Sequence, residues 1–261
     1  MRMHLRFVLP IAALAALLGV SVALFAQAAG QQTKGKDEKA TTGDLTGVWS
    51  QNQPASTRAY NNFTFFKDEP PMTPWAEAKY KTAKPSFGPH SVPISETNDP
   101  VYHGCFPPGV PRVFLHPLIM EIVQTPSRVI FLFEYDQARR VIYTDGRGHD
   151  TAVAPTWMGD STGHWEGDTL VVDTVNFNDK TWLDRVGHPH SEALHLVERL
   201  RRPDQNTLVD EMTMEDAKAY TKPLTAQLVY RLRPTWKVLE QFCEDNETFE
   251  GVEKVVTAPK P

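Results

Sequence analysis

Residues 161–177 read STGHWEGDTLVVDTVNF, and this stretch decides the fold class. On each side of the triplet EGD at 166–168, polar and apolar residues alternate, and a period of two is typical of a half-buried β-strand. A short connection with glycine where the backbone needs a positive φ is typical of a β-hairpin. The stretch therefore predicts two antiparallel strands, at 161–165 and 169–177.

The same period of two recurs along most of the chain that surrounds this hairpin. Short polar turns separate the alternating segments, so each strand is expected to pair with the next. Further strands are predicted at 46–49, 128–135, 139–144, 193–200, 207–214, 224–232 and 237–244. Because closing such a meander removes its unpaired edges, we expect an all-β protein, an antiparallel β-barrel of about eight strands.

The residues before the meander predict a helical and irregular extension. Thr73 is a good N-cap, Pro74 suits the first position of a helix, and Pro85 ends the helix-favouring run between them. Residues 86–111 are rich in Pro, Gly, Asn and His and should be irregular, lying over one mouth of the barrel.

The N-terminus predicts export. Arg2 and Arg6 precede an apolar run that ends before Ala26-Gln27-Ala28, a small-x-small cleavage pattern. We therefore expect a signal peptide at 1–28, with an uncleaved membrane anchor as the alternative. A polar linker at 29–44, expected to be disordered, then leads into a single barrel domain at 45–256.

The charge balance bears on partners. The chain has 27 basic and 32 acidic residues, and removing Arg2 and Arg6 leaves a net charge of −7. A mildly acidic domain has no electrostatic reason to bind nucleic acid or an anionic membrane. We expect a periplasmic or extracellular protein whose partner is a small molecule, with no stable membrane association after cleavage.

Only two cysteines are present, Cys105 and Cys243. An even count in an exported chain predicts a disulfide, and two buried free thiols are the alternative. A cysteine-based metal site is not expected, because neither cysteine stands in a C-x-x-C pair or beside a histidine at ligand spacing.

Six motifs together resemble a large family of secreted bacterial proteins of unassigned activity, over most of residues 73–247. The resemblance implies export and a lipocalin-like barrel, and it implies no catalytic residue. A Gly-x-Trp strand at 46–49 is also similar to the first strand of lipocalin-type barrels, where the tryptophan plugs the closed end. The motifs are CFPPGVPR (105–112), EIVQTP (121–126), IYTDGR (142–147), PTWMGDSTGHWEGDTLVVDT (155–174), NDKTWLDRVGHPHSEALH (178–195) and AYTKP (219–223).

Between His149 and His195 the chain concentrates five of its nine histidines and three of its six tryptophans. Polar groups that converge beside aromatic walls are what a small-molecule pocket needs. The ligand-binding candidates in and around this stretch are Arg147, Trp157, Asp160, Trp182 and His195. The tryptophans suit a flat or apolar ligand or a sugar ring, and ordinary core packing is the alternative.

The segment Gly187-His188-Pro189-His190 holds the catalytic candidates His188 and His190, with Asp184 as the carboxylate partner. On an extended segment the two imidazoles should point to the same side, and Pro189 should hold His190 rigidly. A general base or ligand contact, a metal ligand, and a purely structural loop are all compatible with this pattern.

These features lead to two hypotheses of different class. The first is a secreted lipocalin-like barrel that binds a small apolar or aromatic molecule at one mouth. The alternative is a cofactor-free lyase, isomerase or hydrolase that uses a His–Asp pair on the same barrel. No organic cofactor or metal is expected, and haem lacks a C-x-x-C-H attachment motif.

Overall fold

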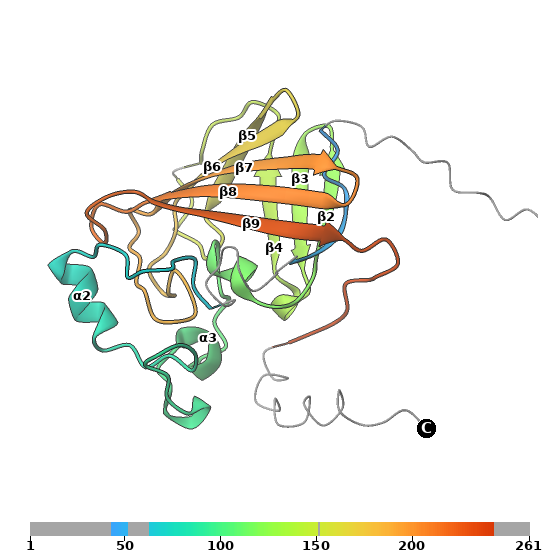
Figure 1. Cartoon of the computed structure of the whole chain (residues 1–261). Helices are drawn as coiled ribbons and strands as arrows, with labels where there is room; N and C mark the ends of the chain where they lie inside the picture. The colour runs from blue at the N-terminus through green and yellow to red at the C-terminus, as the bar shows by residue number, and fades with distance from the viewer. Residues whose placement is uncertain (1–42, 52–62, 151, 243–261) are drawn as a thin grey trace, which may run out of the picture. The chain divides into compact units, whose positions relative to one another are not determined.

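The prediction of an all-β barrel is confirmed. The computed structural model describes residues 43–51, 63–150 and 152–242, and within them the strands form one closed barrel in sequence order (Figure 1). The signal peptide at 1–28, and the linker at 29–44 except its last two residues, lie outside the described residues. The strands are β1 (Gly47–Gln51), β2 (Met120–Thr125), β3 (Arg128–Phe133), β4 (Arg139–Tyr143), β5 (Asp160–Glu166), β6 (Thr169–Val175), β7 (His195–Asp204), β8 (Thr207–Glu215) and β9 (Leu224–Leu232).

Two details of the expected barrel are wrong. The described residues form nine strands instead of about eight, and β4 pairs with β5 in parallel, through Ile142 with Ser161 and Tyr143 with Thr162. Parallel pairing needs a connection of about a dozen residues or more, and the segment 144–159 is long enough to supply it. The other strand pairs are antiparallel, the expected orientation, but β2 at Met120–Thr125 was not among the predicted strands.

The strand predicted at 237–244 does not form in its described part, 237–242. The reason is that β1 pairs with both β2 and β9, so the barrel closes without a further strand. This segment instead lies against the β3–β4 connection, where the Leu239 amide donates to Glu134 Oε2 at 3.0 Å and the Gln137 side chain donates to the Leu239 carbonyl at 2.9 Å.

The predicted helix forms as α2 (Pro74–Tyr80), with the Thr73 hydroxyl accepting from the Ala76 amide. It ends at Tyr80, before the expected stop at Pro85. The segment 86–111, expected to be irregular, contains a second helix, α3 (Pro100–His103), because Asp99 caps it and Pro100 takes its first position. Short 3₁₀ turns complete the extension at Ile94–Glu96 and Arg112–Leu115.

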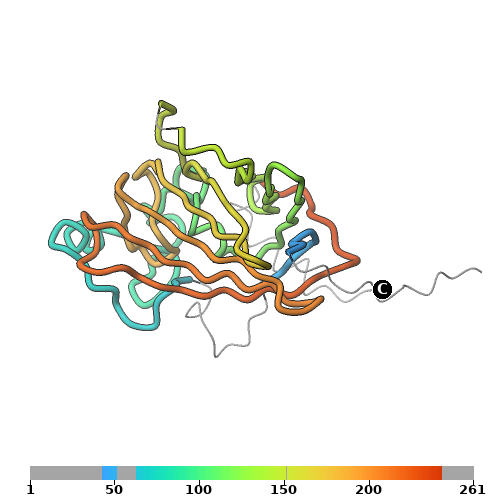
Figure 2. Tube along the Cα trace, turned by 90° about the horizontal axis from the view of Figure 1, so that it is seen from above, coloured from blue at the N-terminus to red at the C-terminus, as the bar shows by residue number. Residues whose placement is uncertain are grey.

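The extension lies at the end of the barrel that carries the β6–β7 and β8–β9 connections. The Thr73 amide donates to the Ala219 carbonyl and the Thr221 amide to the Pro71 carbonyl, both at 2.9 Å. Figures 1 and 2 both place α2 beside the β8–β9 turn. No helix among the described residues has the length and apolar character needed to cross a membrane.

The barrel interior is filled by side chains. Trp49 is completely buried where β1 meets the last residue of β9, and its indole N–H donates to the Leu45 carbonyl at 3.0 Å. This is the end opposite the β6–β7 connection, as expected for a tryptophan that plugs a closed end. Other inward-facing core residues include Ile122, Phe131, Leu170, Leu196, Leu200, Leu208, Met212 and Leu228.

The barrel interior also contains a buried polar cluster around Arg140. Arg140 is buried and donates to both carboxylate oxygens of Glu198 and to the hydroxyls of Ser161 and Thr174. Asp210, on the neighbouring strand β8, is equally buried, and neither of its carboxylate oxygens has a hydrogen-bond partner among the described residues. Buried polar groups therefore accompany the apolar core inside the barrel.

Candidate functional site

The connection between β6 and β7, residues 176–194 and here called the β6–β7 loop, holds the predicted catalytic residues. Internal contacts fix its path, since the Leu183 amide donates to the His188 carbonyl at 2.7 Å. The β8–β9 connection also holds the loop in place. The Tyr220 hydroxyl donates to the Pro189 carbonyl at 2.7 Å, and Asp216 accepts from the Ser191 amide at 2.6 Å. A loop with these supports is rigid enough to position side chains.

The structure brings Asp184 and His188 together, with 2.6 Å between Asp184 Oδ2 and His188 Nδ1. The spacing of four residues lets the carboxylate also accept the amides of Val186 and His188, at 3.1 and 3.2 Å. The second ring nitrogen, Nε2, lies 2.9 Å from Glu69 Oε2 in the extension. His188 therefore joins two carboxylates and links the β6–β7 loop to the extension.

The charge of this group follows from its neighbours. Burial alone would lower the pKa of His188, but Asp184 and Glu69 outweigh it and raise that pKa to about 9. Burial would raise the pKa of Asp184, yet the charge and hydrogen bonds of His188 and its other donors lower it. At neutral pH the site is a buried imidazolium between two carboxylates.

His190 does not join this pair, so the expected constellation of Asp184 with both histidines is wrong. Its Nδ1 lies 3.3 Å from the Ser191 carbonyl and its Nε2 lies 3.3 Å from the Thr181 hydroxyl. Burial lowers the pKa of His190, so the ring is neutral. Since a carbonyl only accepts, Nδ1 carries the proton and Nε2 accepts from Thr181. The turn at Pro189 directs the two rings into different pockets.

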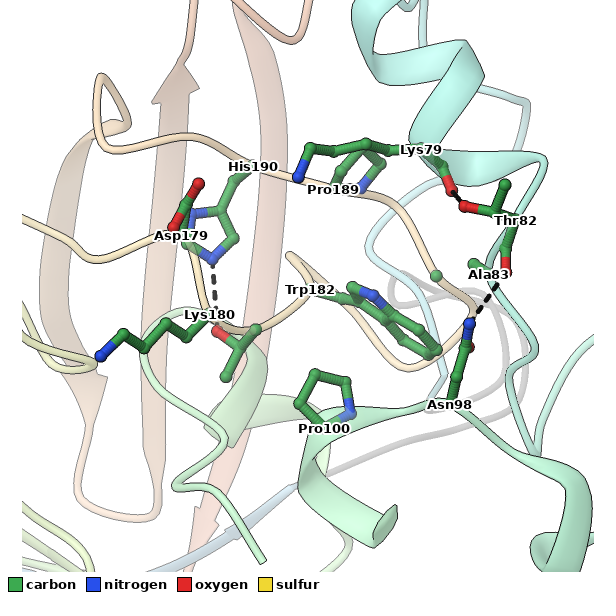
Figure 3. Close-up of a pocket in the computed structure, with 12 residues that line it drawn as sticks. Lys79, Thr82, Ala83, Asn98, Pro100, Asp179, Lys180, Trp182, Pro189 and His190 are labelled. Atoms are coloured by element: carbon green, nitrogen blue, oxygen red, sulfur yellow. Dashed lines mark hydrogen bonds between the residues drawn. The ribbon is translucent and has the colours of Figure 1, made fainter. Parts of the chain in front are cut away.

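His190 lines a cavity of about 180 Å³, here called the Trp182 pocket (Figure 3). In the close-up Lys79 reaches from α2 toward Pro189. Trp182 forms one wall, and its ring lies 5.6 Å from the guanidinium of the buried Arg112. The pocket is lined by Lys79, Thr82, Ala83, Asn98, Pro100, Asp179, Lys180, Thr181, Trp182, Gly187, Pro189 and His190.

Trp157 lies elsewhere, in a shallower cavity of about 220 Å³. Its neighbours there are Pro107, Asp136, Ala138, Arg139, Thr156 and Met158. The Lys180 ammonium lies 5.5 Å from the Trp157 ring and, in Figure 3, points away from Trp182. The two tryptophans predicted to wall one site therefore belong to two neighbouring cavities.

The structure places Asp160 and His195 in a third location, on the outer face of the barrel. His195 Nε2 lies 2.9 Å from Asp173 Oδ2, and His149 joins Asp173 to Asp160 at 2.8 and 3.2 Å. Outward-facing positions on β5, β6 and β7 produce this cluster. His149 and Asp173 were not predicted as site residues, although both lie within the histidine-rich stretch.

Arg147 is exposed and does not line any of the cavities described above. It pairs with Asp145 at 2.6 Å, and its guanidinium lies 3.9 Å from the Tyr143 ring. The expected single site at one mouth is thus divided among several places. No group of three or more His, Cys, Asp or Glu residues in the described ranges is arranged to hold a metal ion.

The predicted disulfide falls partly outside the structure. Cys243 lies beyond the described residues, so its pairing with Cys105 stays a prediction. Within the described ranges there is no free cysteine.

Sequence reasoning missed the site residues that come from the extension. Lys79 and Tyr80 were assigned to the predicted helix, Asn98 to the irregular segment over the barrel mouth, and Glu69 was not singled out. The only signal was that expected position over the mouth, because their contacts with the loop span about a hundred residues of sequence.

Searches for related proteins do not extend this picture: no family model, no curated protein and no solved structure matches the chain.

Proposed function

We propose that the protein binds a small molecule with an aromatic or other flat ring in the Trp182 pocket, at the loop end of the barrel. The observation that carries this proposal is the pairing of Trp182 with His190 in one cavity of about 180 Å³. An indole offers a flat stacking surface, and a neutral imidazole beside it offers a fixed polar contact.

The remaining wall residues support a ligand that also carries polar groups. Lys79 can donate and Asp179 can accept hydrogen bonds, and both line the same cavity. Arg112 lies against Trp182, and Asp99, fully buried, balances the charge of Arg112. The indole is thus held in place before a ligand arrives, which lowers the entropic cost of binding.

The proposal changes one part of the lipocalin-like hypothesis. In a lipocalin the ligand occupies the barrel interior, whereas here the Trp182 pocket lies between the β6–β7 loop and the extension. What it retains of the lipocalin-like character is a closed β-barrel that carries a ligand at one end.

The alternative is a cofactor-free lyase, isomerase or hydrolase that uses the His–Asp pair. Asp184 and His188 are in contact, which favours this alternative. However, a histidine whose pKa is raised to about 9 already holds its proton at neutral pH. The pair as it stands suits a general acid better than a base, so ligand binding is the function we put first.

Export belongs to the same proposal. The sequence at 1–28 directs the chain to the periplasm or the outside of the cell, where a Cys105–Cys243 disulfide would form. Thiol titration of denatured, unreduced protein should find no free thiol, and two free thiols per chain would exclude the bond.

The experiment that tests the binding proposal uses protein purified without denaturation. Mass spectrometry of small molecules released from it should identify a ring compound. Trp182→Leu should carry much less of this compound, while Trp236→Leu, a change at a half-exposed tryptophan on the segment after β9, should carry the normal amount. Equal loading of Trp182→Leu and the unmodified protein would refute the assignment to this pocket.

A further inference from the structure

A second cavity, of about 300 Å³, opens on the other side of the segment that carries His190. We call it the His188 pocket. None of its lining residues belongs to the Trp182 pocket. It is lined by Thr64, Phe66, Lys67, Asp68, Glu69, Tyr80, Gly88, Pro89, Val186 and His188.

Two hydrogen-bond donors in this pocket converge on one carboxylate. His188 Nε2 donates to Glu69 Oε2 at 2.9 Å, and the Tyr80 hydroxyl donates to Glu69 Oε1 at 3.1 Å. Each oxygen of the carboxylate therefore has its own donor. Paired donors of this kind, one of them charged, give geometric specificity for a carboxylate as well as binding energy.

The donors are fixed, whereas the acceptor is not. His188 is 3% exposed, and its other nitrogen is held by the buried Asp184 at 2.6 Å. The Tyr80 ring stacks on the imidazole with centroids 4.6 Å apart. By contrast, the Glu69 side chain is 61% exposed and belongs to an irregular segment. Because the Glu69 side chain is exposed and its segment is irregular, this carboxylate can turn into solvent and leave both donors to water or to another anion.

The charge of the pocket favours an anion at this position. The pKa of His188 is raised to about 9, so the ring keeps its N–H and its positive charge at neutral pH. If Glu69 moves into solvent, that charge faces a cavity whose other lining charges are Lys67 and Asp68. Phe66, Val186 and Pro89 form the apolar part of the wall, which suits a small hydrocarbon group.

We propose that the His188 pocket is a binding site for a small monocarboxylic acid, whose carboxylate takes the two hydrogen bonds that Glu69 accepts in the free protein. Glu69 then acts as an internal competitor that a ligand has to displace. The site is separate from the Trp182 pocket and does not depend on the function proposed for it.

The test measures the binding of benzoate by titration calorimetry at neutral pH. Glu69→Ala removes the competing carboxylate and should bind benzoate at least about tenfold more tightly than the unmodified protein. Glu77→Ala is the matched control, because this exposed glutamate of α2 pairs with Lys81, lines neither pocket and should leave affinity unchanged. Benzamide has the same shape without the charge. It should bind both proteins much more weakly than benzoate binds Glu69→Ala.

A second variant tests the role of the histidine. Adding His188→Gln to Glu69→Ala should abolish the gain, with circular dichroism used to confirm that the double variant is folded. If Glu69→Ala binds benzoate no more tightly than the unmodified protein, or binds benzamide equally well, the proposal is wrong. Neither result bears on the ring compound expected in the Trp182 pocket, because the two cavities have no residue in common.

Discussion

Asp184 in the β6–β7 loop and Asp210 in the barrel are both completely buried, but they have opposite surroundings. Asp184 accepts from the backbone amides of Val186 and His188 and from the His188 ring. Neither oxygen of Asp210 has a hydrogen-bond partner within the described ranges. As a result, the pKa of Asp184 is lowered in spite of its burial, whereas burial raises the pKa of Asp210 well above its ordinary value.

The difference shows that donors, and not burial, decide the charge of a buried carboxyl group in this protein. In the loop, the His188 ring, the Val186 amide and the Thr64 hydroxyl lower the pKa of Asp184 and hold a charged histidine beside it. In the barrel, Arg140 directs its donors to Glu198, Ser161 and Thr174, and burial raises the pKa of Asp210. The loop therefore carries fixed charges at a cavity, whereas the barrel interior disfavours the charge of Asp210.

The largest effect should come from Asp184→Asn. An amide at this position can place its N–H groups against the Val186 and His188 amides, which are themselves donors. It also removes the negative charge that lies nearest to the buried His188 ring. We expect a loss of roughly 3–5 kcal/mol in the free energy of unfolding, measured by urea denaturation. Glu192→Gln, at an exposed carboxylate of the same loop, should change it little. A loss below about 1 kcal/mol for Asp184→Asn would show that the pair does not stabilise the loop.

The second prediction concerns the pH dependence of stability. The pKa of His188 is about 9 in the folded protein and near 6.5 when unfolded, so its contribution is complete below pH 6.5 and is lost as the pH rises through 9. The shift corresponds to about 3 kcal/mol. The free energy of unfolding, measured from pH 6 to 10, should fall in the unmodified protein. His188→Gln should remove this decline, and an unchanged decline would assign it to another group.

Asp210→Asn should have a smaller effect of opposite sign. Because the pKa of Asp210 is raised well above its ordinary value of 3.8 in the folded protein, the protein loses stability as the pH rises above 3.8. The variant does not titrate, so at pH 8 it should be more stable than the unmodified protein by about 1–3 kcal/mol. At pH 4 the two should be nearly equal. Asp168→Asn, at an exposed carboxylate of the β5–β6 turn, provides the control, and a gain that is the same at both pH values would contradict the protonation argument.

Most of the strands, although not β2, could be predicted because their signal is local. In the hairpin at 161–177, alternation and a glycine turn suffice, and β5 and β6 form close to the expected residues. The parallel pairing of β4 with β5 could not be predicted in this way. It depends on the path of segment 144–159, which carries no periodic pattern.

The candidate site could be predicted only in part, for the same reason. The contact of Asp184 with His188 lies within five residues, and sequence reasoning placed both in one site. Glu69, which completes that group, is 119 residues from His188 in sequence. The expectation that both histidines face one side failed because the hydrogen bond between Leu183 and His188 turns the segment.

The smallest effect is expected at His190, which has no carboxylate within hydrogen-bond reach and so provides a contrast with His188. Its ring is held by the Ser191 carbonyl and the Thr181 hydroxyl, two weak neutral contacts at 3.3 Å each. His190→Ala should therefore fold normally and lose about tenfold in affinity for the ring compound of the Trp182 pocket, which corresponds to about 1.4 kcal/mol. Equilibrium binding of the recovered compound measures this loss, and thermal unfolding measures stability.

The control for this prediction is His164→Ala, at an exposed histidine of β5 that lines neither the Trp182 pocket nor the His188 pocket. It should bind the compound normally. If His190→Ala also binds normally, the ligand contacts other parts of the pocket or another site. If it unfolds at a much lower temperature, the imidazole is a structural support of the loop, and the polar contact that we assign to the ligand is instead made to Thr181. A loss of affinity at unchanged stability is the result that places His190 at the ligand, because a purely structural ring could not produce it.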